Sequence, residues 1–118
     1  MKIAIIDDEK DILEMLSRFL TKKKYQVATY QNPLNALSSL DKDTDVVLLD
    51  IMMPQMNGLD VLPKLQEKHP KLKVIMMTAY STLDKVLGSH RGGAIQYIMK
   101  PFESLAKLEV EIAKAAEK

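Results

Sequence analysis

The sequence predicts an α/β domain in which a parallel sheet is covered by helices on both faces. The chain has 118 residues, of which 47% are hydrophobic and 28% are charged, a balance typical of one compact globular domain. Short aliphatic runs alternate with helical patterns along the whole chain. These runs are apolar at successive positions, which is typical of strands buried on both faces. Together the patterns indicate five strands and five helices.

The first half of the chain supplies two strands and two helices. Residues 3–6 form the first strand and residues 25–30 a weaker second strand. The helix expected after Asp8 has one apolar face, made of Ile12, Leu13, Leu16, Phe19 and Leu20. Asn32-Pro33 predicts the start of the second helix, because asparagine is a good N-cap and proline suits the first helical position. That helix start leads into Leu34, Leu37 and Leu40.

The second half continues the alternation. Strands are expected at residues 46–49, 74–77 and 94–99. The helix after Asn57-Gly58 should carry Leu59, Leu62 and Leu65, and Pro63 should bend it. Residues 82–92 contain two glycines and have low helix propensity, so this fourth helix should be short or mobile. The last helix should start near Ser104, with Leu105, Leu108 and Ile112 on its buried side.

Charge and cysteine content exclude several classes of function. The 17 basic and 16 acidic residues give a net charge of +1, which gives no sign of direct nucleic-acid or membrane binding. The absence of cysteine excludes disulfides, a thiol nucleophile and any cysteine-ligated metal. Neither a membrane-spanning run nor a signal peptide is present in the sequence, so we expect a cytoplasmic protein.

Polar side chains follow four of the expected strands. Parallel strands bring their carboxyl ends to one edge of a sheet, where ligands bind. An acid after a strand is commonly only a helix N-cap, so each residue alone is a weak signal, and their joint placement is what indicates a site. The residues concerned are Asp7, Asp8, Glu9, Asp50, Thr78 and Lys100.

The predicted site suits metal-assisted phosphoryl chemistry. Carboxylates clustered at this edge repel one another unless a cation lies among them. With no cysteine, and with His69 and His90 elsewhere, the ligands are oxygens, which favours Mg²⁺. A carboxylate beside Mg²⁺ and opposite a lysine can attack a phosphoryl group. Asp50 is the expected nucleophile, because of its central strand and the turn that follows it.

That turn carries a family resemblance. Residues 50–58, D-I-M-M-P-Q-M-N-G, resemble the phosphoacceptor loop of bacterial two-component response-regulator receiver domains. Thr78-Ala79, Tyr97 and Lys100-Pro101-Phe102 fit the same family pattern, and the resemblance covers the whole chain. It implies one receiver domain over residues 1–118, chemotaxis-receiver-like, with a flavodoxin-like (βα)5 three-layer sandwich and the strand order 2-1-3-4-5.

The resemblance also implies roles for individual residues. Asp50 would accept a phosphoryl group from a sensor histidine kinase or a histidine phosphotransfer protein. Asp8, Asp50 and the backbone carbonyl of Met52 would bind Mg²⁺ directly, and Asp7 would act mainly through water. Lys100 would pair with the phosphoryl oxygens, and the bond that follows it, to Pro101, is expected to be cis. The small Ala79 would leave the acceptor accessible.

The same resemblance implies a readout. Phosphorylation would draw the Thr78 hydroxyl inward and let the Tyr97 ring move from exposed to buried. This would reshape the face of the fourth helix, fifth strand and fifth helix, which signals to an output domain or partner and allows homodimer formation on phosphorylation. The glycine-containing segment 82–92 predicts an unusually mobile face. The apolar Met52 side chain offers no help to hydrolysis, which predicts a long-lived phosphoryl state.

Three other functions are open but less favoured. An aspartate-nucleophile phosphohydrolase of the haloacid-dehalogenase type needs a second aspartate two residues after the nucleophile, where this chain has Met52. A flavodoxin-like nucleotide binder would need glycine or hydroxyl residues after the first strand, where this chain has acids. A phosphate-independent receiver-like binding module is disfavoured because every acceptor-site position is intact.

Overall fold

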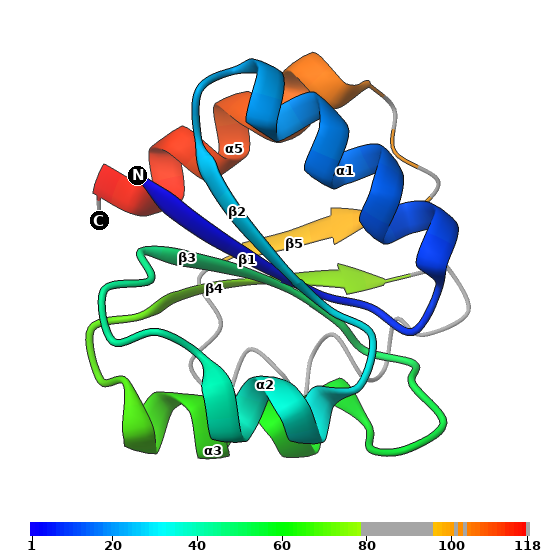
Figure 1. The fold of residues 1–118 in the computed structure, drawn as a ribbon, viewed down its shortest axis with the longest axis vertical. Helices are drawn as coiled ribbons and strands as arrows, with labels where there is room; N and C mark the ends of the chain where they lie inside the picture. Colours follow the sequence, from blue (N-terminus) through cyan, green and yellow to red (C-terminus); the bar gives the residue numbers. More distant parts are fainter. Residues whose placement is uncertain (79–95, 101, 103, 118) are drawn as a thin grey trace.

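The computed structural model describes residues 1–78, 96–100, 102 and 104–117 (Figure 1). Its strands and helices follow one another in the alternation that the sequence predicts. In chain order they are β1 (Lys2–Ile6), α1 (Lys10–Lys22), β2 (Gln26–Tyr30), α2 (Pro33–Ser39), β3 (Val46–Asp50), α3 (Gly58–Lys68), β4 (Lys73–Thr78), β5 (Gln96–Met99) and α5 (Leu105–Glu117). The expected helix over residues 82–92 lies outside the described residues, as do Ala79, Tyr80 and Pro101.

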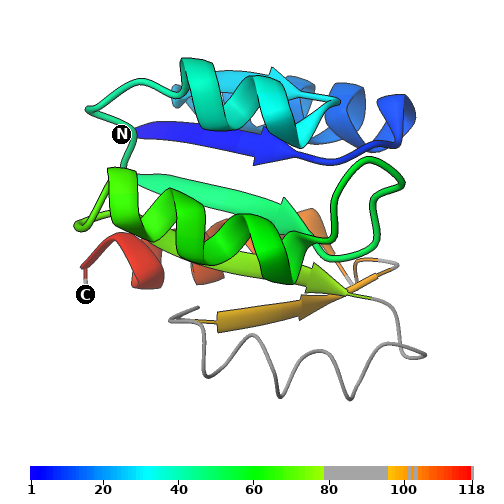
Figure 2. The same ribbon diagram turned by 90° about the horizontal axis from the view of Figure 1, so that it is seen from below.

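The five strands form one sheet in the order β2-β1-β3-β4-β5, and every neighbouring pair is parallel. Helices α1 and α5 cover one face of this sheet, and α2 and α3 cover the other (Figures 1 and 2). The predicted fold class and strand order are therefore confirmed. All strands end at the same edge, where the predicted site lies.

Two apolar cores lie on opposite faces of the sheet, and the central strands supply both. On β3, Val47 and Leu49 belong to the core that includes buried residues of α2 and α3, whereas Val46 and Leu48 belong to the core under α1 and α5. Every residue of β3 is buried. This two-sided burial explains why the strand is apolar at successive positions rather than at alternate ones.

Both predicted asparagine caps form. The Oδ1 of Asn32 accepts a hydrogen bond from the Leu34 N–H at 2.9 Å, and Pro33 is the first residue of α2. The Oδ1 of Asn57 accepts from the Leu59 N–H at 2.8 Å. Helix α3 continues through Pro63 to Lys68. These side chains satisfy N–H groups that have no partner inside the helix.

The leucines that follow the first cap behave differently from one another. Helix α2 is only seven residues long, and its buried residues are Pro33 and Ala36. Leu34 is 53% exposed, and Leu40 is the residue that directly follows the last helical residue.

In the part of the chain that the structure describes, no helix has the length and hydrophobicity needed to cross a membrane.

Candidate functional site

Backbone hydrogen bonds continue the sheet past its strand ends and fix the site residues. The Asp7 N–H donates to the Tyr30 carbonyl at 3.1 Å. Asp50 is the last residue of β3, and Thr78 is the last residue of β4. The Lys100 N–H donates to the Thr78 carbonyl at 2.7 Å, and this backbone hydrogen bond holds the lysine beside the end of β4. The four strand ends that the sequence singled out therefore meet at one edge.

Three carboxylates gather at this edge. Asp7, Asp8 and Asp50 each offer an oxygen, and these oxygens lie within 4.8 Å of one another. Asp7 is fully buried and Asp50 is 4% exposed. Burial, reinforced by the charge of Asp7 and opposed by Lys100, raises the pKa of Asp50 to about 7. The cluster thus holds more negative charge than its surroundings favour.

Lys100 lies against these acids and remains charged. Its Nζ is 2.7 Å from Asp7 Oδ2 and 3.3 Å from Asp50 Oδ1, and its side chain is 13% exposed. Burial acts to lower the pKa of Lys100, but the contacts with Asp7 and Asp50 outweigh it and raise the pKa above its ordinary value. One ammonium therefore faces several carboxylates.

Asp7 belongs to the acidic cluster and is not the N-cap of α1. The N-cap is Glu9, whose side chain makes no capping hydrogen bond. Asp7 Oδ1 accepts from the Glu9 N–H at 2.9 Å, and Asp7 Oδ2 accepts from Lys100. Both carboxylate oxygens are thus engaged, and the carboxylate is held toward the lysine.

The loop after β3 depends on Gly58, which the sequence indicated as part of a helix start and as the last residue of the 50–58 motif. Its N–H donates to the Ile51 carbonyl at 2.7 Å. A Cβ added at this position would clash with the Asp50 carbonyl oxygen and would lie 2.8 Å from the Ile51 Cα. Glycine is therefore required for the first turn of α3 to approach the end of β3. Met52 lies in the same loop and is 51% exposed.

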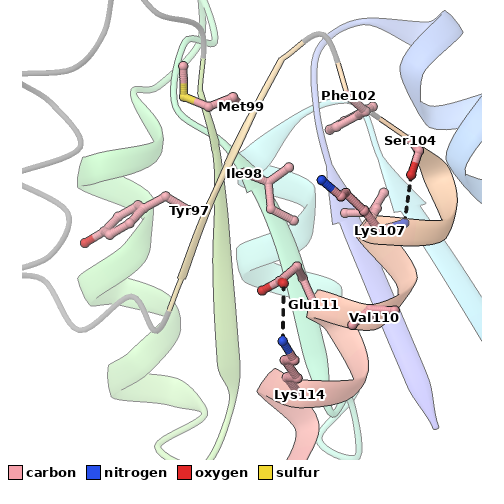
Figure 3. Close-up of a pocket in the computed structure, with 10 residues that line it drawn as sticks. Tyr97, Ile98, Met99, Phe102, Ser104, Lys107, Val110, Glu111 and Lys114 are labelled. Atoms are coloured by element: carbon pink, nitrogen blue, oxygen red, sulfur yellow. Dashed lines mark hydrogen bonds and ion pairs between the residues drawn. The ribbon is translucent and has the colours of Figure 1, made fainter.

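The two predicted switch residues lie on neighbouring strands, β4 and the edge strand β5. Thr78 is buried at the end of β4, and Tyr97 is partly buried on β5. The Tyr97 ring points away from α5 and packs against the core on the α2 and α3 side, whereas Ile98 points toward α5 (Figure 3). The structure brings Asp7, Asp8, Asp50 and Lys100 together, and it places Tyr97 in β5, the strand that Lys100 directly follows.

The donor set suits a hard divalent cation. Asp7, Asp8 and Asp50 could hold a metal ion through carboxylate oxygens, the ligands that Mg²⁺ prefers in proteins. Such an ion would offset the charge that makes the Asp50 carboxylate unfavourable when buried. A carboxylate beside a bound cation and a lysine ammonium can react with a phosphoryl group.

Comparisons with known proteins give one consistent result. A family model described as response regulator receiver domain matches residues 3–113. The DNA-binding transcriptional regulator NtrC of Escherichia coli (strain K12) is 38% identical over 102 residues, which are 86% of this chain and 22% of NtrC. The transcriptional regulatory protein CpxR of Klebsiella pneumoniae is 40% identical over 102 residues, which are 86% of this chain and 43% of CpxR. This chain thus spans less than half the length of either regulator.

A solved receiver-domain structure has the same fold as this chain. The receiver domain of NtrX from Brucella abortus superposes with a TM-score of 0.91 at 28% identity, and the match covers 98% of both chains.

Proposed function

This chain belongs to the response regulator receiver domain family, and from that premise we propose that it accepts a phosphoryl group on Asp50 with Mg²⁺ bound beside it. The donor would be the phosphohistidine of a sensor histidine kinase or a histidine phosphotransfer protein. One observation carries the proposal: a buried Asp50 carboxylate is grouped with two other carboxylates and lies 3.3 Å from the Lys100 ammonium. That arrangement supplies a nucleophile and a cation for the transferred group.

In this proposal the Asp50 carboxylate attacks the phosphorus, the bond between phosphorus and the histidine nitrogen breaks, and an acyl phosphate forms. Asp8, Asp50 and the Met52 backbone carbonyl would hold Mg²⁺ directly, and Asp7 would act through water. When bound, Mg²⁺ would neutralise charge on the carboxylates and the phosphoryl oxygens. Lys100 would form a charge-assisted hydrogen bond to a phosphoryl oxygen.

The phosphoryl group would then change a surface. The Thr78 hydroxyl would turn toward the new oxygens, and the partly buried Tyr97 ring would move further inward on the α2 and α3 side. The face that includes β5 and α5 would report this change to an output domain, an effector or a second copy of the chain. The receiver would occupy residues 1–118 and act in the cytoplasm without contacting nucleic acid directly. It would catalyse only its own phosphorylation and slow dephosphorylation.

The test is a measurement of intact mass over time with acetyl phosphate and Mg²⁺. We expect the mass of one added phosphoryl group. This adduct should not form when EDTA removes Mg²⁺, and it should not form on the Asp50→Asn variant. Asp60→Asn, which removes an exposed carboxylate in the first turn of α3, should retain the adduct. A folded protein that takes up no phosphoryl group would refute the proposal and favour a phosphate-independent binding module. An adduct that survives Asp50→Asn would identify a different acceptor.

A further inference from the structure

A fourth carboxylate contacts Lys100 without belonging to the acidic cluster. Among the described residues, the carboxylates within 4.8 Å of one another are those of Asp7, Asp8 and Asp50. Glu9 is not in this group, yet its Oε1 lies 3.7 Å from the Lys100 Nζ. The contact therefore links Glu9 to the lysine rather than to the candidate cation ligands.

The backbone around Glu9 fixes where this side chain starts. Glu9 is the N-cap residue of α1, and its N–H donates to Asp7 Oδ1. Its side chain makes no capping hydrogen bond and is 61% exposed. Glu9 and Lys100 thus approach Asp7 together, one through its backbone and the other through its ammonium.

We propose that Glu9 is a positioning residue that holds the Lys100 ammonium near Asp7 before phosphoryl transfer. The inference rests on the proposed function, in which Lys100 must bond to a phosphoryl oxygen. To do so, the ammonium has to give up part of its contact with Asp7 and Glu9. Glu9 therefore restrains the lysine in the resting protein and slows phosphorylation.

The expected effect is modest because the contact is exposed. A solvent-exposed ion pair contributes at most about 1 kcal/mol, which corresponds to roughly a fivefold change in rate. We therefore expect Glu9→Gln to increase the rate of Asp50 phosphorylation by about two- to fivefold.

The experiment measures this rate with acetyl phosphate at saturating Mg²⁺, with Mg²⁺ affinity determined separately by NMR titration. Saturation removes any effect of Glu9 on metal affinity. Glu9→Asp retains the charge but shortens the side chain by one methylene, so it should share most of the gain. Asp11→Asn removes a carboxylate from the first turn of α1, where no ion pair with Lys100 is described, and should leave the rate unchanged.

A second readout separates positioning from general structural effects. In a Lys100→Met background, Glu9→Gln should no longer change the rate, because the group that Glu9 restrains is gone. The ¹⁵N resonance of the Lys100 ammonium should shift in Glu9→Gln and stay in place in Asp11→Asn.

Each opposing result has a defined meaning. A wild-type rate in Glu9→Gln, equal acceleration in Asp11→Asn, or the full Glu9 effect in the Lys100→Met background would overturn the inference. A wild-type rate in Glu9→Asp would also overturn it, because charge alone would then suffice. If the wild-type protein takes up no phosphoryl group, the proposed function fails instead, so the two failures are distinguishable.

Discussion

The Asp50 carboxylate is buried beside a second carboxylate, and this environment disfavours its charged form. Burial and the charge of Asp7 raise its pKa from 3.8 to about 7. The folded state therefore holds the Asp50 proton more tightly than the unfolded chain does. Stability is lost as the pH rises from about 4 toward 7, and the full loss is present above pH 7.

We accordingly expect Asp50→Asn to stabilise the protein in EDTA at pH 8, by about 1–3 kcal/mol. The gain should shrink at pH 5, where most Asp50 side chains of the folded wild-type protein are already protonated. Urea denaturation at both pH values checks this, with Asp60→Asn as the control. A gain that is equal at both values would show that buried charge at Asp50 is not the cause.

Gly58 is a second position where a single atom matters. Adding a methyl group would push it into the Asp50 carbonyl oxygen, a backbone atom that cannot rotate away. We expect Gly58→Ala to destabilise the fold by about 2 kcal/mol or more and to slow phosphorylation of Asp50.

The comparison for Gly58→Ala is Asn57→Ala, which removes the neighbouring helix cap and should cost about 1 kcal/mol. Asn57→Ala should slow phosphorylation of Asp50 less than Gly58→Ala does, because it adds no atom between α3 and β3. Equal stability and equal phosphorylation of wild type and Gly58→Ala would contradict the close approach.

At the scale of elements, one hydrogen bond connects the residue just before β2 with α5. The Tyr25 hydroxyl donates to Glu109 Oε2 at 3.1 Å, across 84 positions of sequence. Burial, together with this bond, raises the pKa of the Tyr25 hydroxyl. We expect Tyr25→Phe to lower the free energy of unfolding by about 1 kcal/mol.

Tyr30→Phe is the matched control, because no side-chain hydrogen bond of Tyr30 is described. Chemical denaturation of both variants gives the two differences in unfolding free energy. Equal losses in the two variants would assign the effect to the ring environment rather than to the bond with Glu109.

The elements also show what the sequence could predict. Apolar runs located the centres of the strands, and the two asparagines located the starts of α2 and α3. The polar ends of strands escaped detection: β1 begins at Lys2 and β4 at Lys73, because backbone pairing extends the ladder to residues whose side chains are not fully buried. Hydrophobic pattern measures side-chain burial, so it does not report such ends.

The candidate site was predictable to a similar degree. Strand-end position identified Asp7, Asp8, Asp50 and Lys100, because a parallel sheet makes them neighbours. The contact between Glu9 and Lys100 joins residues 91 positions apart, and it depends on the side chain not capping α1. Strand-end position also placed Glu9 at this edge, but an acid at a helix start normally indicates a cap, so the sequence did not single out its contact with Lys100.

At the scale of the whole molecule, the acidic edge should couple metal binding to folding. A ligand that binds only the folded state stabilises it by about 1.4 kcal/mol at roughly ten times its dissociation constant. We expect Mg²⁺ to raise the melting temperature, and Asp8→Asn and Asp50→Asn to remove most of that rise.

Differential scanning calorimetry in MgCl2, compared with NaCl of equal ionic strength, separates specific binding from screening. An equal rise in both salts would mean that the carboxylates of Asp7, Asp8 and Asp50 do not hold the ion.

The contact at Gly58 also has a mechanical consequence. At Gly58 the backbone of α3 meets the backbone of Asp50 and Ile51 directly, with no Cβ between them that could change position. The two segments are also joined by the hydrogen bond from Gly58 N–H to the Ile51 carbonyl. A small displacement of the main chain at Asp50 should therefore displace the start of α3 by nearly the same amount. Helix α3 should then move as one unit. In NMR spectra recorded during phosphorylation of Asp50, its amide signals should shift before those of α2.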